Sequence, residues 1–315
     1  MEKVILGNTK LKVGRINLGG NVFGWTLNEQ QSFNILDSFI DGGFNFLDTA
    51  DTYSWWVDGN VGGESEAIIG KWVQQRRNRH QLVIATKVGS QNRTHPVDIS
   101  RAYILKSIDE SLQRLRTDYI DLYYTHFDDG KTPIEETLST YQDLIKAGKI
   151  RYVGVSNISP ARLTESLEIA KKTGLPRYEV LQPHYNLAER SQYETMFASI
   201  ANMYDMSVLP YWSLASGFLT GKYRSRADLE KSVRGGDVKK YLNLKGLGIL
   251  NALDTVAARY RCRPATIALA WLLAQPCIAA PVVSATSQSQ LEMIFAATRL
   301  HLDDDDLNLL TTASD

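Results

Sequence analysis

The chain has 315 residues, of which 43% are hydrophobic and 22% are charged, an ordinary balance for a protein with one sizeable core. Its 35 basic and 35 acidic side chains cancel and the isoelectric point is near 7.0, which gives no electrostatic case for nucleic acid or an anionic membrane as a partner. The length fits two ordinary domains or one large α/β barrel.

The first element that we expect is a β-hairpin in "KVILGNTKLKVGR", turning at Gly7 and Asn8. In a barrel, a hairpin at this place would close the bottom. The N-terminal residues also lack the apolar core of a signal peptide, and we therefore expect a cytoplasmic protein.

Eight short apolar runs are spread over the rest of the chain. Most carry β-branched or aromatic residues without clean polar alternation, which is typical of parallel strands buried on both faces. In chain order they are "INLGG" from Ile16, "FNFLDTA" from Phe44, "LVIATK" from Leu82, "YIDLYYTH" from Tyr119, "RYVGVSN" from Arg151, "YEVLQPHYN" from Tyr178, "SVLPYWS" from Ser207 and "IAAPVVSA" from Ile278.

Helical patterns lie between these runs. Residues 28–43 carry an apolar stripe and end at two glycines, a common helix stop. Residues 98–115 open with Asp98 and Ser100 as candidate N-caps. The same scheme returns in residues 133–150 and 159–174.

The alternation of strand and helix predicts one α/β domain over residues 1–315. Its crossovers are long enough for parallel pairing, which favours a (β/α)8 TIM barrel with the N-terminal hairpin and long loops at the C-terminal face. A doubly wound open sheet is the alternative. Against it, "LGGNVFG" is not a Gly-x-Gly-x-x-Gly turn, and no amphipathic helix begins at its end.

Three remaining segments and two cysteines complete the description of the chain. The segment of residues 221–248 is long, charged and contains glycines, and we expect it to form a mobile loop on the active-site face. "HLDDDDLNLL" is expected to be a solvated turn before a last helix. The most apolar stretch, "TIALAWLLA" from Thr266, is too short to span a bilayer. Cys262 and Cys277 lie in no metal or redox motif, and we expect no metal site.

Ionisable side chains stand at the ends of successive predicted strands, where barrel active sites are built. Asp48 with Tyr53, then Lys87, then His126 follow the second, third and fourth strands. Taken singly, each has an ordinary interpretation as a helix cap, a surface lysine or a hydrogen-bonded core histidine. Together they predict a catalytic cluster.

A tyrosine beside a lysine and a histidine is typical of a proton donor. The reference pKa of a phenol is near ~10, too high for easy donation at neutral pH. A neighbouring ammonium favours the phenolate and lowers that pKa, while a carboxylate holds the ammonium in place. We therefore expect Asp48 to pair with Lys87, and the loop to curl back so that Tyr53 meets both Lys87 and His126.

Six motifs in this order resemble those of the aldo-keto reductase superfamily, in its bacterial and potassium-channel-β-like branches. They are "NFLDTADTY", "ATKVG", "DLYYTH", "GVSN", "LQPHYN" and "SLASGFLTGKY", and the resemblance covers roughly residues 2 to 300. It implies a (β/α)8 barrel that binds a nicotinamide cofactor without a Rossmann fold. It also implies the tetrad Asp48, Tyr53, Lys87 and His126, in which the nicotinamide gives hydride to a carbonyl carbon while the tyrosine protonates the oxygen.

The same resemblance implies a set of cofactor-binding residues. Ser156, Asn157 and Gln182 would hold the nicotinamide carboxamide, and Trp212 would stack on the ring. The pyrophosphate would lie along Ser213, Leu214, Ser216, Gly217 and Lys222. At the adenosine end, Ser284, Thr286 and Gln290 match binding positions.

The adenosine end also departs from the family pattern. Met293 and Ile294 replace the Glu–Asn pair that usually holds the adenine amino group. No Arg or Lys occurs at positions 281–294 to pair with a 2′-phosphate, although Arg234 or Lys231 from the long segment could compensate. The resemblance favours NADPH, and these departures leave NADH open.

Aromatic side chains are expected to line the substrate pocket, namely Phe23, Trp25, Trp55, Trp56 and Phe127. Such walls suit apolar or sugar-like carbonyl compounds and do not discriminate between them. We expect a small-molecule carbonyl or alcohol as the partner, no nucleic acid and no membrane, and a chain that acts as a monomer or small homo-oligomer.

Two other functions compete with an NAD(P)H-dependent aldehyde or ketone reductase. One is a cofactor-sensing regulatory subunit like the potassium channel β-subunits, in which an Asn stands at the position that matches His126. The other is a Schiff-base aldolase that uses Lys87, for which the lysine would need to be unpaired and its pKa depressed.

Overall fold

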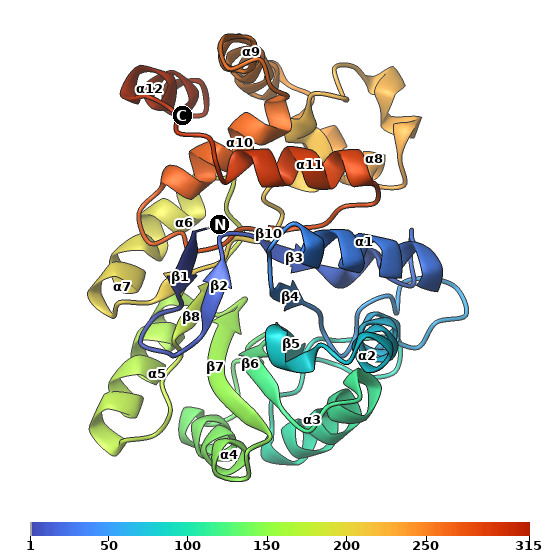
Figure 1. The fold of residues 1–315 in the computed structure, drawn as a ribbon. Coiled ribbons are helices and arrows are strands. Elements are labelled where there is room, and N and C mark those ends of the chain that lie inside the picture. The colour runs from blue at the N-terminus through green and yellow to red at the C-terminus, as the bar shows by residue number, and fades with distance from the viewer. Residues whose placement is uncertain (1) are drawn as a thin grey trace.

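The computed structural model describes residues 2–315, and its centre is a sheet of eight parallel strands in the order β10-β3-β4-β5-β6-β7-β8-β9 (Figure 1). Each strand overlaps one of the eight predicted runs. Their bounds are β3 (Asn17–Gly19), β4 (Phe46–Asp48), β5 (Val83–Val88), β6 (Ile120–Thr125), β7 (Ile150–Ser156), β8 (Val180–Gln182), β9 (Ser207–Val208) and β10 (Val282–Val283).

The sheet closes on itself between β9 and the segment that leads into β10. The Val208 N–H donates to the Cys277 carbonyl at 2.9 Å, and the Ala279 N–H donates back to the Val208 carbonyl at 3.0 Å. At the other end, β10 pairs in parallel with β3. These contacts confirm the predicted (β/α)8 barrel and exclude the open doubly wound sheet.

Helices surround the barrel and cover its outer face (Figure 1). Three of these helices begin where the sequence predicts. Their N-cap side chains accept a hydrogen bond from the backbone of the first turn, and the caps are Asn28, Ser100 and Ser159. Asp98 is not the cap; its carboxylate accepts the Ser100 N–H. The helices are α1 (Glu29–Asp41), α2 (Glu64–Arg76), α3 (Arg101–Leu115), α4 (Ile134–Lys146), α5 (Pro160–Thr173), α6 (Ser191–Met196), α7 (Ala198–Met203), α8 (Gly235–Val238), α9 (Leu244–Arg259), α10 (Pro264–Ala274), α11 (Gln288–Ala297) and α12 (Asp304–Ala313).

The N-terminal hairpin, β1 (Lys3–Ile5) and β2 (Lys12–Gly14), plugs one end of the barrel as predicted. Leu6, Leu11 and Val13 are buried in one apolar cluster with inward-facing residues of β4 to β8. Gly7 is left-handed at φ +46° and sits so close to the Glu179 carbonyl that a Cβ would lie 2.6 Å from it. The hairpin therefore seats its turn against the start of β8.

Two segments near the C-terminus differ from expectation. Residues 221–248 are not a plain loop, because they form η4 (Arg226–Lys231), α8, η5 (Lys239–Tyr241) and the start of α9; their mobility stays a prediction. The acidic run begins at Asp303, the N-cap of α12, and continues through the first turn of that helix; Asp303, Asp304 and Asp305 are exposed as expected, whereas Asp306 is buried. Asp306 is 1% exposed there because it is paired with Arg259.

The apolar stretch from Thr266 forms most of α10, whose residues are nearly all buried inside the protein. Across residues 2–315, none of the helices combines the length and the apolar run that a membrane crossing requires.

Candidate active site

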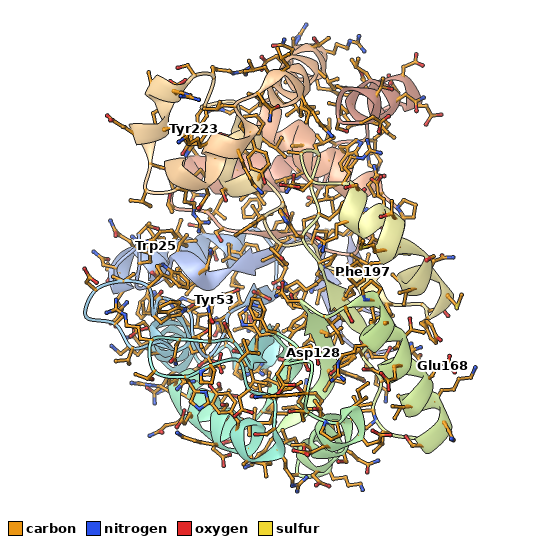
Figure 2. All side chains as sticks on the ribbon, turned by 180° about the vertical axis from the view of Figure 1, so that it is seen from behind. Trp25, Tyr53, Asp128, Glu168, Phe197 and Tyr223 are labelled. Carbon is orange, nitrogen blue, oxygen red and sulfur yellow. The ribbon has the colours of Figure 1, made fainter. Side chains whose placement is uncertain are left out.

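The ends of β4 and β5 bring Asp48, Tyr53 and Lys87 into one buried cluster. The Lys87 ammonium donates to the Asp48 carboxylate, to the Tyr53 hydroxyl at 2.8 Å and to the Thr49 carbonyl at 2.8 Å. Lys87 and Asp48 are both fully buried. The N-terminal hairpin faces the viewer in Figure 1. Tyr53 is labelled in Figure 2, which shows the barrel from behind, on the side opposite to the hairpin.

The loop after β4 curls back over β5, as the sequence predicts. The Thr49 N–H donates to the Ala85 carbonyl at 2.9 Å, and the Asp51 N–H donates to the Lys87 carbonyl at 3.2 Å. Further on, Ser54 is left-handed at φ 75° and its hydroxyl donates to the Phe23 carbonyl at 2.8 Å. These bonds fix the main chain on both sides of Tyr53. No side-chain pattern marks the Thr49 carbonyl, so sequence reasoning missed this acceptor.

The electrostatics of the cluster keep the lysine charged and the phenol protonated. Burial alone would lower the pKa of Lys87, but the adjacent Asp48 and Tyr53 raise it above its usual value. Burial raises the pKa of Tyr53 by more than the Lys87 ammonium lowers it. The expectation of a lowered tyrosine pKa is therefore wrong for this structure, because sequence reasoning left out the desolvation of the phenolate.

His126 follows β6 and joins the cluster from the next strand. Its main-chain N–H donates to the Val88 carbonyl at 2.8 Å. Its ring lies edge-on to the Tyr53 ring, with the two ring centroids 6.0 Å apart. Burial, together with the Lys87 charge, holds the pKa of His126 well below its usual range. A neutral imidazole beside the phenol can hydrogen-bond an oxygen without adding a charge.

Gln182, at the end of β8, is hydrogen-bonded directly to the cluster. Its side-chain amide donates to the second oxygen of Asp48 at 2.9 Å, and its main-chain carbonyl accepts the Ser156 hydroxyl at 2.7 Å. Asp48 is thus held by Lys87 on one side and by Gln182 on the other. Sequence reasoning placed Gln182 near the cofactor but did not foresee this bond, because the two residues are 134 positions apart.

Asn157 ties the β7 end to the histidine. Its amide donates to the His126 carbonyl at 2.8 Å and to the Ser156 hydroxyl at 3.0 Å, and its oxygen accepts the Tyr211 hydroxyl at 3.1 Å. The backbone of Asn157 is left-handed at φ 39°. A small cavity next to it is lined by Asn157, Gln182, Pro183, His184, Phe197 and Tyr211.

The turn after β9 presents one exposed ring and one unpaired cation. Trp212 is 44% exposed. Beyond it Ala215, Ser216 and Gly217 are all left-handed, which turns the chain sharply. Lys222 has no carboxylate within ion-pair distance among residues 2–315, and its ammonium lies beside Gly217.

Two other residues predicted along this turn offer less to a ligand. The Ser213 hydroxyl donates to the Pro210 and Val282 carbonyls at 3.0 Å each, so it is already engaged. Leu214 is half-buried against the core.

At the predicted adenosine end, three polar side chains bond to one another or to neighbours. The Ser284 hydroxyl donates to Asn21 at 2.5 Å. The side-chain oxygen of Gln290 accepts the Thr286 N–H at 2.8 Å and the Thr286 hydroxyl at 3.2 Å. Ile294 is 3% exposed and belongs to the core, so this side chain does not take the place of a polar adenine ligand.

Three of the predicted wall residues flank the tetrad. The Trp56 ring lies edge-on to the rings of both Tyr53 and Trp25, with centroid distances of 6.1 and 5.6 Å. The ring centroid of Phe127 lies 5.0 Å from that of His126.

The other two wall residues and one basic residue lie differently from expectation. Trp55 is half-buried in the loop that follows Tyr53. Phe23 is 1% exposed within the outer core and does not form an open wall. The guanidinium of Arg234 lies 4.8 Å from the centre of the Trp25 ring. Sequence reasoning had named Arg234 only as a candidate for a 2′-phosphate.

Comparison with known proteins places the chain in a family. The aldo/keto reductase family model matches residues 14–315. An uncharacterized oxidoreductase, YrpG, of Bacillus subtilis is 33% identical over 98% of this chain and 95% of its own length. The aldo-keto reductase YhdN of the same organism is 32% identical over 99% and 93%. A probable voltage-gated potassium channel subunit beta of Oryza sativa is 30% identical over 92% and 89%. The chain therefore belongs to the aldo/keto reductase family of oxidoreductases.

Proposed function

We propose that the protein interconverts aldehydes or ketones and alcohols by NAD(P)(H)-dependent hydride transfer, with Tyr53 as the proton donor. Small aldehydes, sugars and similar carbonyl compounds are the substrates that its aromatic walls suit. The observation that carries the proposal is the shared ammonium: the fully buried Lys87 donates at once to the fully buried Asp48 carboxylate and to the Tyr53 hydroxyl.

The role of each tetrad residue follows from its charge. Tyr53 is protonated at neutral pH, since a phenol has a reference pKa near ~10 and burial raises the pKa of this one further; it therefore holds a proton to donate. Lys87 stabilises the phenolate that remains after donation, and Asp48 keeps the ammonium in place. The neutral imidazole of His126 orients the carbonyl oxygen toward the phenol.

The residues at the mouth fit a nicotinamide cofactor, which would supply the hydride. The exposed ring of Trp212 can stack on a flat group, and Lys222, which has no carboxylate within ion-pair distance among residues 2–315, suits a pyrophosphate. Ser156, Asn157 and Gln182 would hold the carboxamide, and Ser216 and Gly217 would line the phosphates. Ser284, Thr286 and Gln290 would hold the adenosine end.

Either NADPH or NADH fits this site, since aldo/keto reductases generally use NAD(P)H. Met293 and Ile294 offer no polar contact to adenine, and positions 281–294 carry no basic residue for a 2′-phosphate. Arg234 has no carboxylate within ion-pair distance among residues 2–315, which leaves its charge for a phosphate. We favour NADPH, the cofactor that the resemblance to aldo-keto reductases implies.

The test compares the wild-type protein with Tyr53→Phe in reduction of methylglyoxal and a nitrobenzaldehyde with each cofactor, followed by the loss of reduced-cofactor absorbance. We expect turnover in the wild type and a loss of about 10²–10⁴-fold in kcat for the variant. Thermal stabilisation by cofactor should be the same in both proteins, because the hydroxyl is removed without changing the ring. Normal turnover by Tyr53→Phe would show that another group donates the proton.

A second candidate is a cofactor-sensing regulatory subunit with slow reductase activity. Similarity to the rice potassium channel β-subunit favours it. The potassium channel β-subunits resemble one another in carrying Asn at the position that matches His126. The histidine of this chain therefore favours a working enzyme. Tight cofactor binding with negligible turnover across a broad carbonyl panel would select the regulatory function.

The aldolase alternative is disfavoured because a Schiff base requires a neutral amine. Asp48 and Tyr53 raise the pKa of Lys87 instead.

A further inference from the structure

A second group of buried ionisable side chains lies behind the loop that carries Tyr53. Glu66 on α2 is fully buried, and its carboxylate accepts the Thr86 hydroxyl at 2.5 Å and the Arg114 Nε at 2.6 Å. Arg114 extends from α3. This carboxylate is therefore neutralised by the one arginine that reaches it.

Asp51 is the second carboxyl of the group and has no such partner. It is 9% exposed, and its Oδ1 is sealed from solvent without a hydrogen bond in residues 2–315. None of the described Lys, Arg or His side chains lies within ion-pair distance of it. The nearest strand carries Lys87, whose ammonium is committed to the tetrad. An ionised Asp51 would add a second negative charge beside a single, already paired cation.

The other groups that face Asp51 do not offset this charge. They are Glu66, Arg114, Lys87 and the hydroxyls of Tyr103, Tyr123 and Tyr141. The Tyr123 hydroxyl is itself buried and finds no hydrogen-bond partner in the described part of the chain. Burial and then the charge of Glu66 raise the pKa of Asp51 well above its usual range, and they outweigh the lowering by Arg114, by the backbone N–H of Thr52 and by Lys87.

Asp51 is also part of the loop that positions the phenol. Its N–H donates to the Lys87 carbonyl at 3.2 Å, and Tyr53 follows two residues later with its own N–H bonded to the Ala50 carbonyl. A displacement of the Asp51 carboxyl toward solvent would pull on both bonds. The distance between the Tyr53 hydroxyl and the Lys87 ammonium would then change.

We propose that Asp51 is a positioning residue, an uncharged buried acid that keeps the Tyr53 loop seated against β5, so that its ionisation at alkaline pH displaces the loop and lowers turnover. The physical reason is that like charges repel strongly where water is excluded. The part of this proposal that concerns turnover rests on the proposed function. The charge state of Asp51 and the order of its loop do not.

The test uses Asp51→Asn, whose side chain has the same shape and no charge at any pH. Asp305→Asn, at an exposed position on α12, is the matched control. Thermal unfolding and hydrogen exchange of residues 49–54 are followed from about pH 5 to pH 9, a range above the unfolded-state pKa of aspartate. Neither measurement requires turnover.

The expected signs follow from proton linkage. The folded wild type keeps a proton that the unfolded chain has released, so its stability falls as pH rises until the folded-state pKa is passed. Within this window its folding equilibrium constant should fall about tenfold per pH unit relative to Asp51→Asn. Asp305→Asn should parallel the wild type. Above the folded-state pKa, loop exchange should be faster in the wild type than in Asp51→Asn, and the alkaline decline of kcat should be absent from Asp51→Asn.

Parallel stability curves for the wild type and Asp51→Asn would mean that Asp51 is already ionised, which overturns the proposal. An alkaline decline of kcat with the same midpoint in both proteins, or equal loop exchange, would overturn the positioning role while leaving the reductase assignment intact. Absence of turnover in every variant would count against the reductase alone, because stability and exchange still decide the state of Asp51. Should Asp51→Asn fail to fold, the infrared carbonyl stretch of a protonated carboxylic acid in the neutral wild type supports the proposal, and its absence overturns it.

Discussion

Replacement of Lys87 by methionine tests the tetrad most directly, because this ammonium touches three of its neighbours. The change removes its bonds to Asp48, to the Tyr53 hydroxyl and to the Thr49 carbonyl. Asp48 is left fully buried, and among residues 2–315 its remaining side-chain partners are the Gln182 amide at 2.9 Å and the Tyr53 hydroxyl at 3.5 Å. Removing one member of a buried ion pair costs about 3–5 kcal/mol in general. A chain of 315 residues should therefore melt roughly 5–8 °C lower.

Removal of the second charge separates stability from chemistry. In the double variant Asp48→Asn/Lys87→Met, no uncompensated charge remains, so most of the lost stability should return. Activity should not return, because the phenolate left by Tyr53 has lost its cation; we expect about 10²–10⁴-fold lower kcat in both the single and the double variant.

The assays are thermal unfolding and steady-state reduction of an aromatic aldehyde, with Asp305→Asn as the control for an exposed charge. A wild-type melting temperature for Lys87→Met would contradict the predicted cost of an unpaired buried carboxylate. A double variant that is no more stable than the single one would also contradict it, because the penalty would then not come from an isolated carboxylate.

Three further outcomes are expected. His126→Gln should reduce kcat while cofactor binding persists, as single-turnover and thermal-shift measurements would show. Because the pKa of His126 is depressed in the folded state, the unfolded chain binds more protons below about pH 6.5; wild-type stability should fall as pH drops through that value, and the fall should be shallower in His126→Gln. Gly154→Ala should destabilise the barrel by about 1–3 kcal/mol, since its Cβ would lie 2.6 Å from the Tyr124 ring, and urea unfolding that matches the wild type would contradict this. Asn28→Ala should cost about 1 kcal/mol by removing the capping box of α1, measured by the same unfolding assay.

The barrel and its strand ends were predictable because their determinants are local. Eight apolar runs spaced by helical patterns can satisfy their backbone and bury their faces in few ways, and the parallel barrel is one of them. The convergence of Asp48, Lys87 and His126 follows from this, since neighbouring parallel strands end at the same edge. The Gly7 turn of the hairpin likewise has a local cause.

Other features depended on contacts that no local pattern encodes. The bond from Gln182 to Asp48 and the proximity of Arg234 to Trp25 join segments far apart in the chain. The burial of Phe23 and of Asp306 was equally hidden, because an aromatic residue near a strand end and an acidic run both have an ordinary surface interpretation.

The amino-acid sequence by itself determined the order of strands and helices, the hairpin and the side chains that stand at each strand end. The tertiary structure alone decided the charge balance among them. A pKa is a sum of desolvation and charge contributions over all neighbours in space, so the residue types around Tyr53 predicted a lowered pKa, whereas desolvation of the phenol raises it. For the same reason only the folded chain reveals that Asp51 is buried within the field of the Glu66 charge, with no cation at ion-pair distance among residues 2–315.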